Sequence, residues 1–550
     1  MNLPVRRTSS PSPGATRRTG SPSYKLRMVS SILPLALMRC FLMPCRLIIL
    51  FTTVIGAGLL LAPWPPLGVA GEWVWPRHTL PTNFVESLDR LIWPLICGSL
   101  IVAFCAAGLR RIASVGSMHR GLLLVGLTGL SFLWLNAARQ AAPSPHRELR
   151  PVWILYDKYV SGYFFEATFN VASTQQMLVD YESRMAKGDV LHAGTHPPGL
   201  LLLNRGLLKL TAEYPSVVRF SQAVQNGESV RMFRAVEAAG QIARPLSATE
   251  FAALHLSSMF STMFAAMTVI PVFGLTRRLT DSRTAWRAAA LMITVPTIGI
   301  FVPRSDVLYA CSGMFLAWAA VSAILTQRRA KRWLLSLLSG FMLFCCLLLS
   351  LAHVPVLVML AMFAVGFVLL DLKARFGGIL ETTIVAAASF LIVCVAWQHW
   401  TGCNLFNVWR MNLANHAGFY SQSVRTWYAW FAVNPLELAM AVGLPMAAMA
   451  IVMLVQTMKG IRFSNPKSVT NGRLFAIACA LTWTLLWLSG KNMGEAARLW
   501  CFLTPWVAII AAEAVDSDAI NSQKTWLALL IAQLTIATIT VGRVSGFLEF

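Results

Sequence analysis

Long apolar stretches recur along almost the whole chain, and they decide what it can fold into. Between residues 46 and 542 we count thirteen such stretches, each close to the 17 to 25 residues that a helix needs to cross a bilayer. With 56% hydrophobic and only 13% charged residues, the 550-residue chain holds more apolar surface than a water-soluble domain buries. We therefore predict an all-α polytopic membrane protein with about 11 to 13 spanning helices.

Short polar breaks separate these stretches. The expected spans are 46–64, 91–109, 121–138, 251–275, 286–302, 307–326, 333–352, 355–371, 379–398, 435–456, 473–489, 498–514 and 525–542. Only His353, Val354 and Pro355 separate one pair of spans, which predicts a tight hairpin because a proline at a helix end costs little.

Three regions follow from this pattern. Residues 1–45 begin with a segment that is rich in Arg, Ser and Pro and has no acid in its first 30 residues, which predicts a disordered basic arm. Residues 46–542 form one membrane domain, and 543–550 form a short tail. A cleaved signal peptide is the alternative for the start of the chain, but an uncleaved first span fits the long arm better.

Lysine and arginine residues cluster in alternate breaks between the spans. These clusters are Arg110, Arg111 and Arg120; Arg277, Arg278, Arg283 and Arg287; Arg328, Arg329, Lys331 and Arg332; Lys373 and Arg375; and Lys459, Arg462, Lys467 and Arg473. By the positive-inside rule they mark the cytoplasmic side, which also places the N-terminus there. The formal charge of +23 therefore reflects topology, and no nucleic-acid partner is expected.

The opposite face then receives the long loops 139–250 and 399–434 and the short loop 490–498. Within the first of these, the run Pro198–Leu210 is too short to span and carries charges, so we expect a helix in the membrane interface. The cysteines lie mostly in apolar stretches without CxxC or Cys/His spacing, which argues against a disulfide framework or a zinc site.

The first long loop contains carboxylates near the expected membrane surface, among them Asp157 and Glu166. A carboxylate there can act as a general base or hold a divalent cation such as Mg²⁺ or Mn²⁺. The simpler alternative is that these acids are solvated loop charges. His196, before a Pro-Pro-Gly turn, either joins such a site or caps the interfacial helix.

Asp306 lies at the mouth of a span, where an acid is costly in lipid and indicates function. The compatible alternative is a helix cap, since Ser305 or Asp306 at the start of a helix would satisfy free amide groups and suit the helix dipole.

The loop 399–434 combines amides, aromatic rings and cations, which are the groups that sugar hydroxyls and phosphates require. Its candidates are Asn412, His416 and Tyr420 for a sugar or acceptor and Arg425 for a phosphate. An interfacial aromatic belt explains part of this composition but not the run of asparagines.

The last outer loop has the sequence SGKNMGEAARLW and places Lys491, Glu495 and Arg498 at a helix entrance. Cations on this face oppose the topological bias, so we expect an anionic partner such as a lipid-linked phosphate. The alternative is an internal pair of Glu495 with Lys491 or Arg498.

The order of YFFEAT, THPPG and PRSD resembles the membrane glycosyltransferases of the GT-C type, in particular the protein O-mannosyltransferase and aminoarabinose transferase branches. The segments NLFNVWRMNLANHAGFY, RTWYAWFAVNPLE and SGKNMGEAARLWCFLTPW resemble uncharacterised bacterial members, which implies a location in the bacterial inner membrane. The resemblance covers residues about 90 to 515 in outline. The chain departs from the pattern in one place, because Ser161 and Gly162 stand where those branches have acids before the tyrosine.

This resemblance implies a polyprenyl-phosphate sugar donor, a glycan, lipid or protein acceptor on the outer side, inversion at the anomeric carbon and a carboxylate base. Carried onto this chain, Asp157 or Glu166 would be the base, with Asp306 and His196 at the acceptor or metal site. Arg425, Lys491 and Arg498 would hold the donor phosphate, and Asn412, His416, Tyr420 and Glu495 would bind sugar or acceptor.

A transporter or lipid flippase is the alternative, and a structural membrane protein a weaker third. The charges mark span ends and outer loops rather than span centres, and no repeat of two halves is visible, which favours the transferase.

Overall fold

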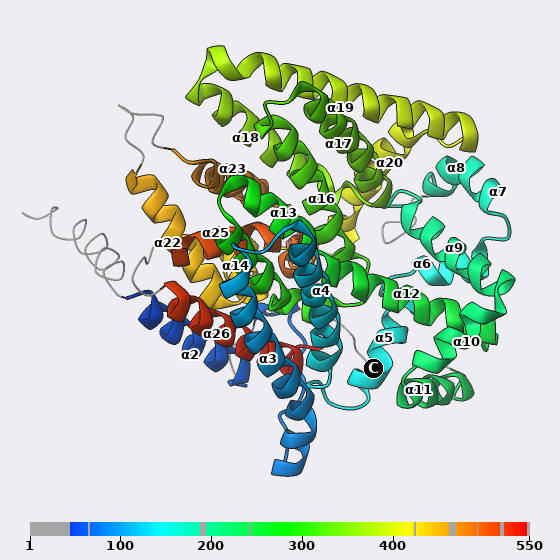
Figure 1. The fold of residues 1–550 in the computed structure, drawn as a ribbon. Helices are drawn as coiled ribbons and strands as arrows, with labels where there is room; N and C mark the ends of the chain where they lie inside the picture. The colour runs from blue at the N-terminus through cyan, green and yellow to red at the C-terminus, as the bar shows by residue number, and fades with distance from the viewer. Residues whose placement is uncertain are drawn as a thin grey trace, which may run out of the picture. The chain divides into compact units, whose positions relative to one another are not determined.

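The computed structural model describes residues 44–63, 67–187, 194–240, 244–422, 425–460, 469–491, 493–516 and 522–546. The chain divides into two compact units, Met1–Pro44 and Cys45–Phe550, and nearly all described residues belong to the second. The expected basic arm therefore lies outside the described residues except at its end. Within the second unit the described secondary structure is helical apart from one small pair of strands (Figure 1).

Ten helical segments of the described chain are long and apolar enough to cross a membrane. They are α3 (Phe84–Arg111), α4 (Ser117–Arg139), α12 (Ala248–Met267) with α13 (Val269–Leu279), α14 (Ser282–Ile293) with α15 (Pro296–Phe301), α16 (Asp306–Leu325), α17 (Arg329–Leu349), α18 (Val354–Leu370), α19 (Leu372–Thr401), α23 (Asn471–Leu488) and α26 (Ser522–Arg543). This confirms an all-α polytopic membrane protein. The expected hairpin is also present, as a single turn of 3-10 helix, η2 (Leu351–His353), between α17 and α18.

The other three expected spans fall on apolar helices that are bent or short. Helices α21 (Trp427–Val442) and α22 (Leu444–Gly460) meet at an angle of 110°, and α2 (Cys45–Leu61) and α25 (Thr504–Asp516) fall below the length of a full span. The bend lies at Gly443, whose φ is 91° and where an added Cβ would lie 2.0 Å from Gln533 Oε1. A glycine is needed there because both the backbone conformation and the space exclude a side chain.

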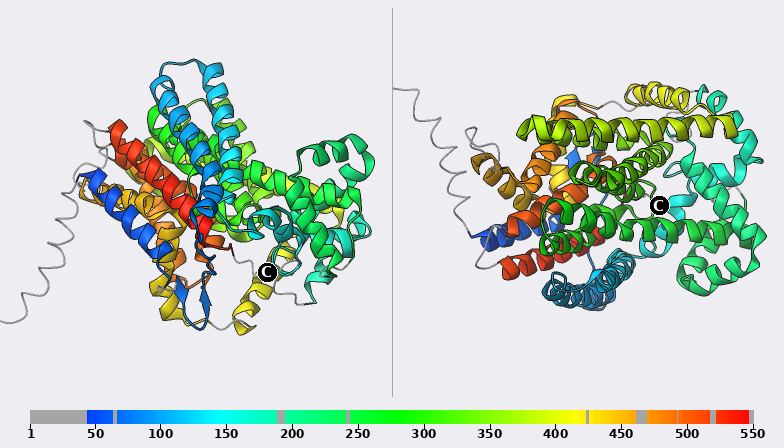
Figure 2. Two further views of the ribbon diagram at one scale, coloured as in Figure 1. Left: turned by 90° about the horizontal axis from the view of Figure 1, so that it is seen from below. Right: turned by 45° about the horizontal axis from the view of Figure 1, so that its top comes forward.

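The long segment between α4 and α12 folds into short helices. They are α5 (His146–Tyr156), α6 (Tyr163–Phe165), the π-helix η1 (Glu166–Asn170), α7 (Thr174–Val179), α8 (Tyr181–Met185), α9 (Gly199–Glu213), α10 (Pro215–Val224) and α11 (Gly227–Ala238). They lie together on one side of the bundle, away from α2 and α26 (Figures 1 and 2). The helix expected at 198–210 is therefore present, as α9.

The remaining outer loops are also structured. Helix α20 (Leu405–Gln422) follows α19, and α24 (Ala496–Leu499) with the 3-10 turn η4 (Cys501–Leu503) precedes α25. Strands β1 (Gly68–Val69) and β2 (Trp73–Val74) form an antiparallel hairpin in which Gly68 pairs with Val74 and Val69 with Trp73.

The buried centre of the bundle is α14 with α15, in which every residue from 284 to 301 is buried. Its Trp286 donates Nε1–H to Cys105 O at 2.9 Å, and an added Cβ at Gly108 would lie 2.2 Å from that indole ring. Small residues let helices approach closely, and this contact drives helix association in lipid, where the hydrophobic effect does not act between helices.

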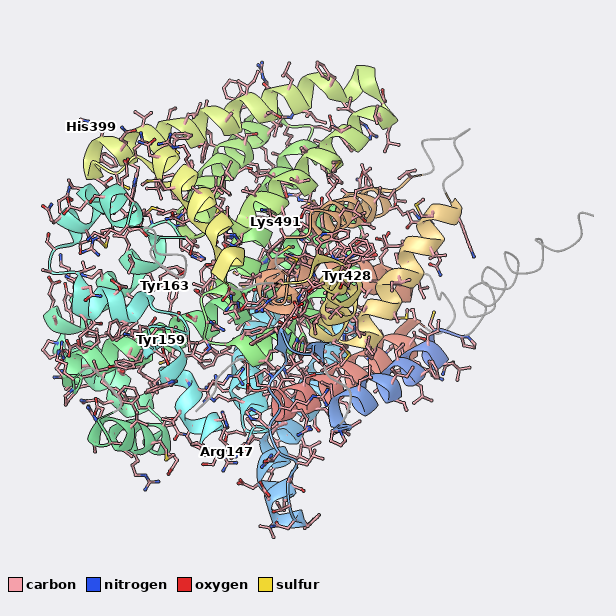
Figure 3. All side chains as sticks on the ribbon, turned by 180° about the vertical axis from the view of Figure 1, so that it is seen from behind. Arg147, Tyr159, Tyr163, His399, Tyr428 and Lys491 are labelled. Carbon is pink, nitrogen blue, oxygen red and sulfur yellow. The ribbon has the colours of Figure 1, made fainter. Side chains whose placement is uncertain are left out.

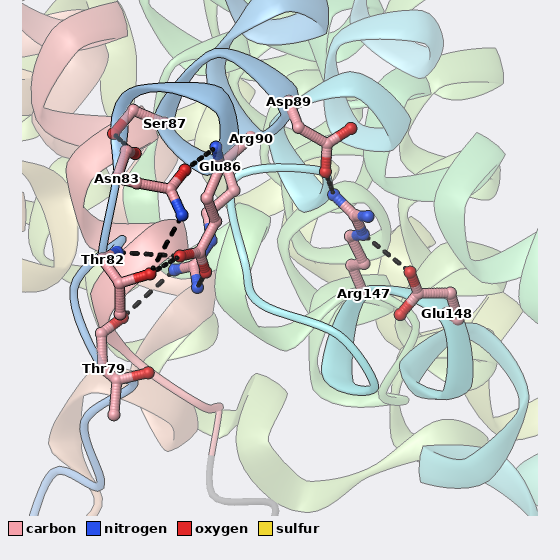
Figure 4. Close-up of polar contacts among 9 residues, drawn as sticks. All are labelled: Thr79, Thr82, Asn83, Glu86, Ser87, Asp89, Arg90, Arg147 and Glu148. Carbon is pink, nitrogen blue, oxygen red and sulfur yellow. Dashed lines mark hydrogen bonds and ion pairs between the residues drawn. The ribbon is translucent and has the colours of Figure 1, made fainter.

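An ion-pair chain fixes the start of the long outer segment against α3 (Figure 4). Arg147 on α5 bridges Asp89 on α3 at 2.6 Å and Glu148 at 2.7 Å. The α3 N-terminus is closed by Asn83, whose side chain accepts the amide of Glu86 at 2.9 Å. The start of α5 is thereby held against α3.

Candidate functional site

A buried cluster of charged residues lies at the start of α16. Arg304 and Asp306 are only 6% and 8% exposed, and Asp306 is the first residue of the helix. The N-cap alternative is only partly realised, because Ser305 makes no side-chain capping bond although the acid does lie at the positive end of the helix. Arg304 donates Nη2–H to Val160 O, which attaches the first long loop to this cluster.

The last outer loop supplies the cluster's second pair of charges. Arg498 donates Nη2–H to Glu495 Oε2 at 2.7 Å, so the expected internal pair is present. Burial alone would lower the pKa of Arg498, but the neighbouring carboxylates of Glu495 and Asp306 raise it above its ordinary value. By the same balance, burial and Arg498 lower the pKa of Arg304 to about 10 in spite of Asp306. Two guanidinium groups and two carboxylates therefore share one site.

The first long loop covers this site with an aromatic residue. Tyr163 is 5% exposed, and burial together with nearby Tyr309 and Asp306 raises the pKa of its hydroxyl well above the ordinary value. Its ring meets that of His196 edge-on at 5.6 Å, and Tyr181 donates its hydroxyl hydrogen to His196 O at 2.8 Å. Tyr163 in the first long loop and Lys491 in the last outer loop are labelled in Figure 3. The segments YFFEAT, THPPG and PRSD thus meet in space.

The turn that carries His196 packs directly on the membrane domain. An added Cβ at Gly199 would lie 2.4 Å from Leu348 O, so the backbones of α9 and α17 are in contact there. The same end of the bundle contains His353, which is fully buried between Ser312 Oγ at 2.7 Å and Ser350 O at 2.9 Å.

Lys491 and His416 mark the open edge of the site. Lys491 is exposed, while His416 is partly buried. The pKa of His416 is lowered by burial and by Lys491, and Glu495 opposes this shift, so all three side chains are neighbours. A cation at the exposed edge of a buried charge cluster suits an anionic ligand arriving from the membrane surface.

Arg425, expected to bind phosphate, has a partner within the chain. Its Nη1–H donates to Glu72 O at 3.0 Å. The carboxylate of Glu72 also accepts Thr426 N–H at 2.9 Å and Trp430 Nε1–H at 2.7 Å. Arg425 therefore fastens the β1–β2 hairpin to the start of α21.

The asparagine side chains of α20 donate hydrogen bonds to other segments of the protein. Asn407 donates to Glu182 Oε2 at 3.0 Å, and the buried Asn412 donates to Gly194 O at 3.4 Å. Asn415 donates to Met185 O at 3.0 Å and Gly194 O at 2.8 Å. The run holds α8 and the residues just before His196, while the Tyr420 side chain lies outside the described residues.

Replacing Asn415 by alanine should loosen this segment. The change removes two hydrogen bonds to backbone carbonyls and leaves Gly194 O with only the longer bond from Asn412, a loss of about 1–3 kcal/mol. We expect faster hydrogen exchange in residues 194–199, measured by mass spectrometry. Asn404→Ala is the control, because Asn404 caps only its own helix by accepting Phe406 N–H. Equal exchange in both variants would show that Asn415 does not hold the loop.

Asp157 and Glu166 have local partners. Asp157 ends α5, and its Oδ1 accepts Tyr159 N–H at 2.7 Å. Glu166 begins η1, and its Oε1 accepts the Asn170 amide at 2.9 Å. Both carboxylates are partly exposed, which matches the alternative of solvated loop charges better than a buried base.

A metal site does not emerge from the described residues, where no three His, Cys, Asp or Glu side chains lie close enough together to hold an ion. Neither Asp157 or Glu166, each a candidate base or cation ligand, nor Asp306 with His196, the candidate acceptor or metal site, is part of such a group. We therefore derive no chemical step through Mg²⁺ or Mn²⁺.

The sequence alone predicts no role for two residues of the site, nor for one buried acid in α21. Arg304 and Tyr163 belong to the PRSD and YFFEAT motifs, which was the available signal. Glu437 is buried within α21 and accepts Trp75 Nε1–H at 3.1 Å, an acid inside an apolar stretch that composition alone could have marked.

Sequence comparisons give no relative, since no protein-family profile and no curated protein matches the chain. Two structures of an oligosaccharyltransferase from Archaeoglobus fulgidus are similar in fold. The structure with zinc and sulfate has 13% identity and a TM-score of 0.45 over 76% of this chain and 53% of that one. The structure with a tethered acceptor peptide has 11% identity and a TM-score of 0.46 over 76% and 55%. The match thus spans about half of the archaeal enzyme, whose activity is not carried over by it.

Proposed function

We propose that this protein is a membrane glycosyltransferase that moves a sugar from a polyprenyl-phosphate donor to an acceptor on the non-cytoplasmic face. The observation that supports this most is the buried cluster of Arg304, Asp306, Glu495 and Arg498 beneath Tyr163. Charges are costly to bury near lipid and indicate function when they converge at one place. The cluster joins the three motifs on which the resemblance to GT-C enzymes rests.

The cluster has the groups that glycosyl transfer from a phosphate requires. The acceptor hydroxyl must lose a proton as its oxygen attacks the anomeric carbon, and Asp306 is the acid of this cluster at the helix start. The bond from that carbon to the phosphate oxygen breaks, and the phosphate keeps the electron pair. Its growing negative charge is stabilised by cations, which Lys491 and Arg498 supply.

The contacts assign different tasks to the cations. Arg498 is held by its ion pair with Glu495, so its guanidinium is oriented before a ligand binds. Lys491 is exposed and free to approach a phosphate. Arg425 donates to the backbone carbonyl of Glu72, so its part is to hold the β1–β2 hairpin. Preorganised cations of this kind stabilise a leaving phosphate without having to rearrange.

The test is release of lipid phosphate by the full-length protein in nanodiscs that contain polyprenyl-phosphate sugars. We expect release with one donor of a panel, and a rise of about tenfold in KM for Lys491→Ala, because one charge contact to phosphate is lost. Lys209→Ala is the control, since Lys209 is an exposed cation on α9. Absence of release with every donor by folded protein would contradict the proposal and favour transport.

A further inference from the structure

A cavity lies near the end of α16, whereas the Asp306 cluster lies at the start of that helix. Its volume is about 660 Å³, and it is enclosed by α4, α13, α16 and α17. Four of its lining residues are cations, namely Arg120, Arg277, Arg278 and Lys331. None of the described residues that line it is acidic. The cavity therefore concentrates positive charge that the protein itself does not neutralise.

Two other cations on α17 are neutralised by a carboxylate of the chain. Arg329 and Arg332, on the same helix as Lys331, share the carboxylate of Glu381 at 2.7 and 2.8 Å. The four cavity cations form no ion pair among the described residues. Arg120 donates only to a backbone carbonyl, that of Val115 at 3.0 Å, and its buried Nε atom has no partner. An anion from outside the chain would supply the missing acceptors.

The cavity is apolar below its basic mouth. The four cations lie near the ends of their helices, whereas Leu124, Phe315 and Trp318 line the wall deeper in. Phe315 and Trp318 precede the end of α16 by ten and seven residues, a depth of about 10–15 Å at the rise of an α-helix. That depth reaches into the hydrocarbon of a bilayer. A ligand that fills the cavity needs a charged head and an apolar tail.

The positive-inside rule explains why cations lie at this end but not why these four surround a cavity. Arg110, Arg111 and Arg283 satisfy the rule without lining the cavity, and Arg277, Arg278 and Lys331, which do line it, are exposed as well. The close placement of Arg120, Arg277 and Arg278 without a carboxylate has a cost in mutual repulsion, which a bound anion removes.

We propose that this cavity binds one anionic phospholipid, with its phosphate among the four cations and one acyl chain along Leu124, Phe315 and Trp318. Arginine suits phosphate because its planar group donates two parallel hydrogen bonds. Asp306 and Trp318 are twelve residues apart on α16, about 18 Å, so the lipid site is separate from the proposed transfer site. The proposal holds whether or not the chain transfers sugar.

The test is native mass spectrometry of the full-length protein in detergent, after addition of phosphatidylglycerol or phosphatidylcholine. We expect one phosphatidylglycerol to be retained in preference to phosphatidylcholine. In Arg120→Gln/Arg277→Gln/Arg278→Gln, its affinity should fall by about 100-fold or more, since each of the three cations near a lipid surface contributes about fivefold. The matched control is Arg110→Gln/Arg111→Gln/Arg283→Gln, which removes three cations at the same end and should retain the lipid.

Two further measurements separate a lipid site from a plain anion site. Trp318→Ala should weaken phosphatidylglycerol binding while leaving the four cations in place. Inorganic phosphate at millimolar concentration should not displace the lipid. Equal loss of lipid in both triple variants, or displacement by inorganic phosphate alone, would overturn the proposal.

Discussion

Gly340→Val is expected to destabilise the protein strongly, with a loss of about 3 kcal/mol or more in the free energy of unfolding. A Cβ atom at this position of α17 would lie 2.2 Å from Ala386 O and 2.9 Å from Phe390 N on α19. These are backbone atoms, which cannot move aside as a flexible side chain does. The two helices must separate, and Ser389 Oγ, which donates to Leu337 O at 2.8 Å, then loses its bond as well. The measurement is the thermal midpoint of the purified protein in nanodiscs.

Gly377→Val is the matched control for this prediction. Gly377 also lies on this helix pair, in α19, but an added Cβ there meets no atom within 4 Å. Both variants place a β-branched residue in a helix, so any difference between them measures the contact alone. Similar midpoints for the two variants would show that α17 and α19 do not pack as closely as described.

The spans were predictable because each depends on local composition alone. An apolar stretch of sufficient length forms a helix in lipid wherever it lies, since its backbone has no other way to satisfy its hydrogen bonds. The breaks within spans were not predicted. The 110° bend between α21 and α22 depends on Gly443 meeting Gln533, a residue 90 positions later in the chain. The sequence of neither segment alone predicts such a contact.

The site was predictable only in part, for a related reason. Alternation of charged loops assigns Asp306, Glu495 and Lys491 to one end of the bundle, but it does not say which helices are neighbours. Their convergence follows from packing. The asparagines of α20 show the opposite case, because an amide suits a sugar hydroxyl and a backbone carbonyl equally well. For Asn415 the structure shows two carbonyl partners.

Asp306→Asn is expected to lower kcat for sugar transfer by about 10²–10⁴-fold, the usual contribution of a positioned general base. The amide has the same shape as the carboxylate but cannot accept the proton of the acceptor hydroxyl. Binding of the donor should change much less, because the cations at the site remain. Release of lipid phosphate under saturating donor measures kcat, and donor titration gives KM separately.

Three further variants decide whether this acid is the base. Asp157→Asn and Glu166→Gln should each lower kcat less than tenfold, because their carboxylates are partly exposed and accept hydrogen bonds from Tyr159 and Asn170. Asp306→Glu should restore part of the activity, since a longer carboxylate still accepts a proton, and this result would separate chemistry from misfolding. If instead Glu166→Gln abolishes turnover while Asp306→Asn does not, the base belongs to the first loop and Asp306 only balances the charge of Arg304 and Arg498.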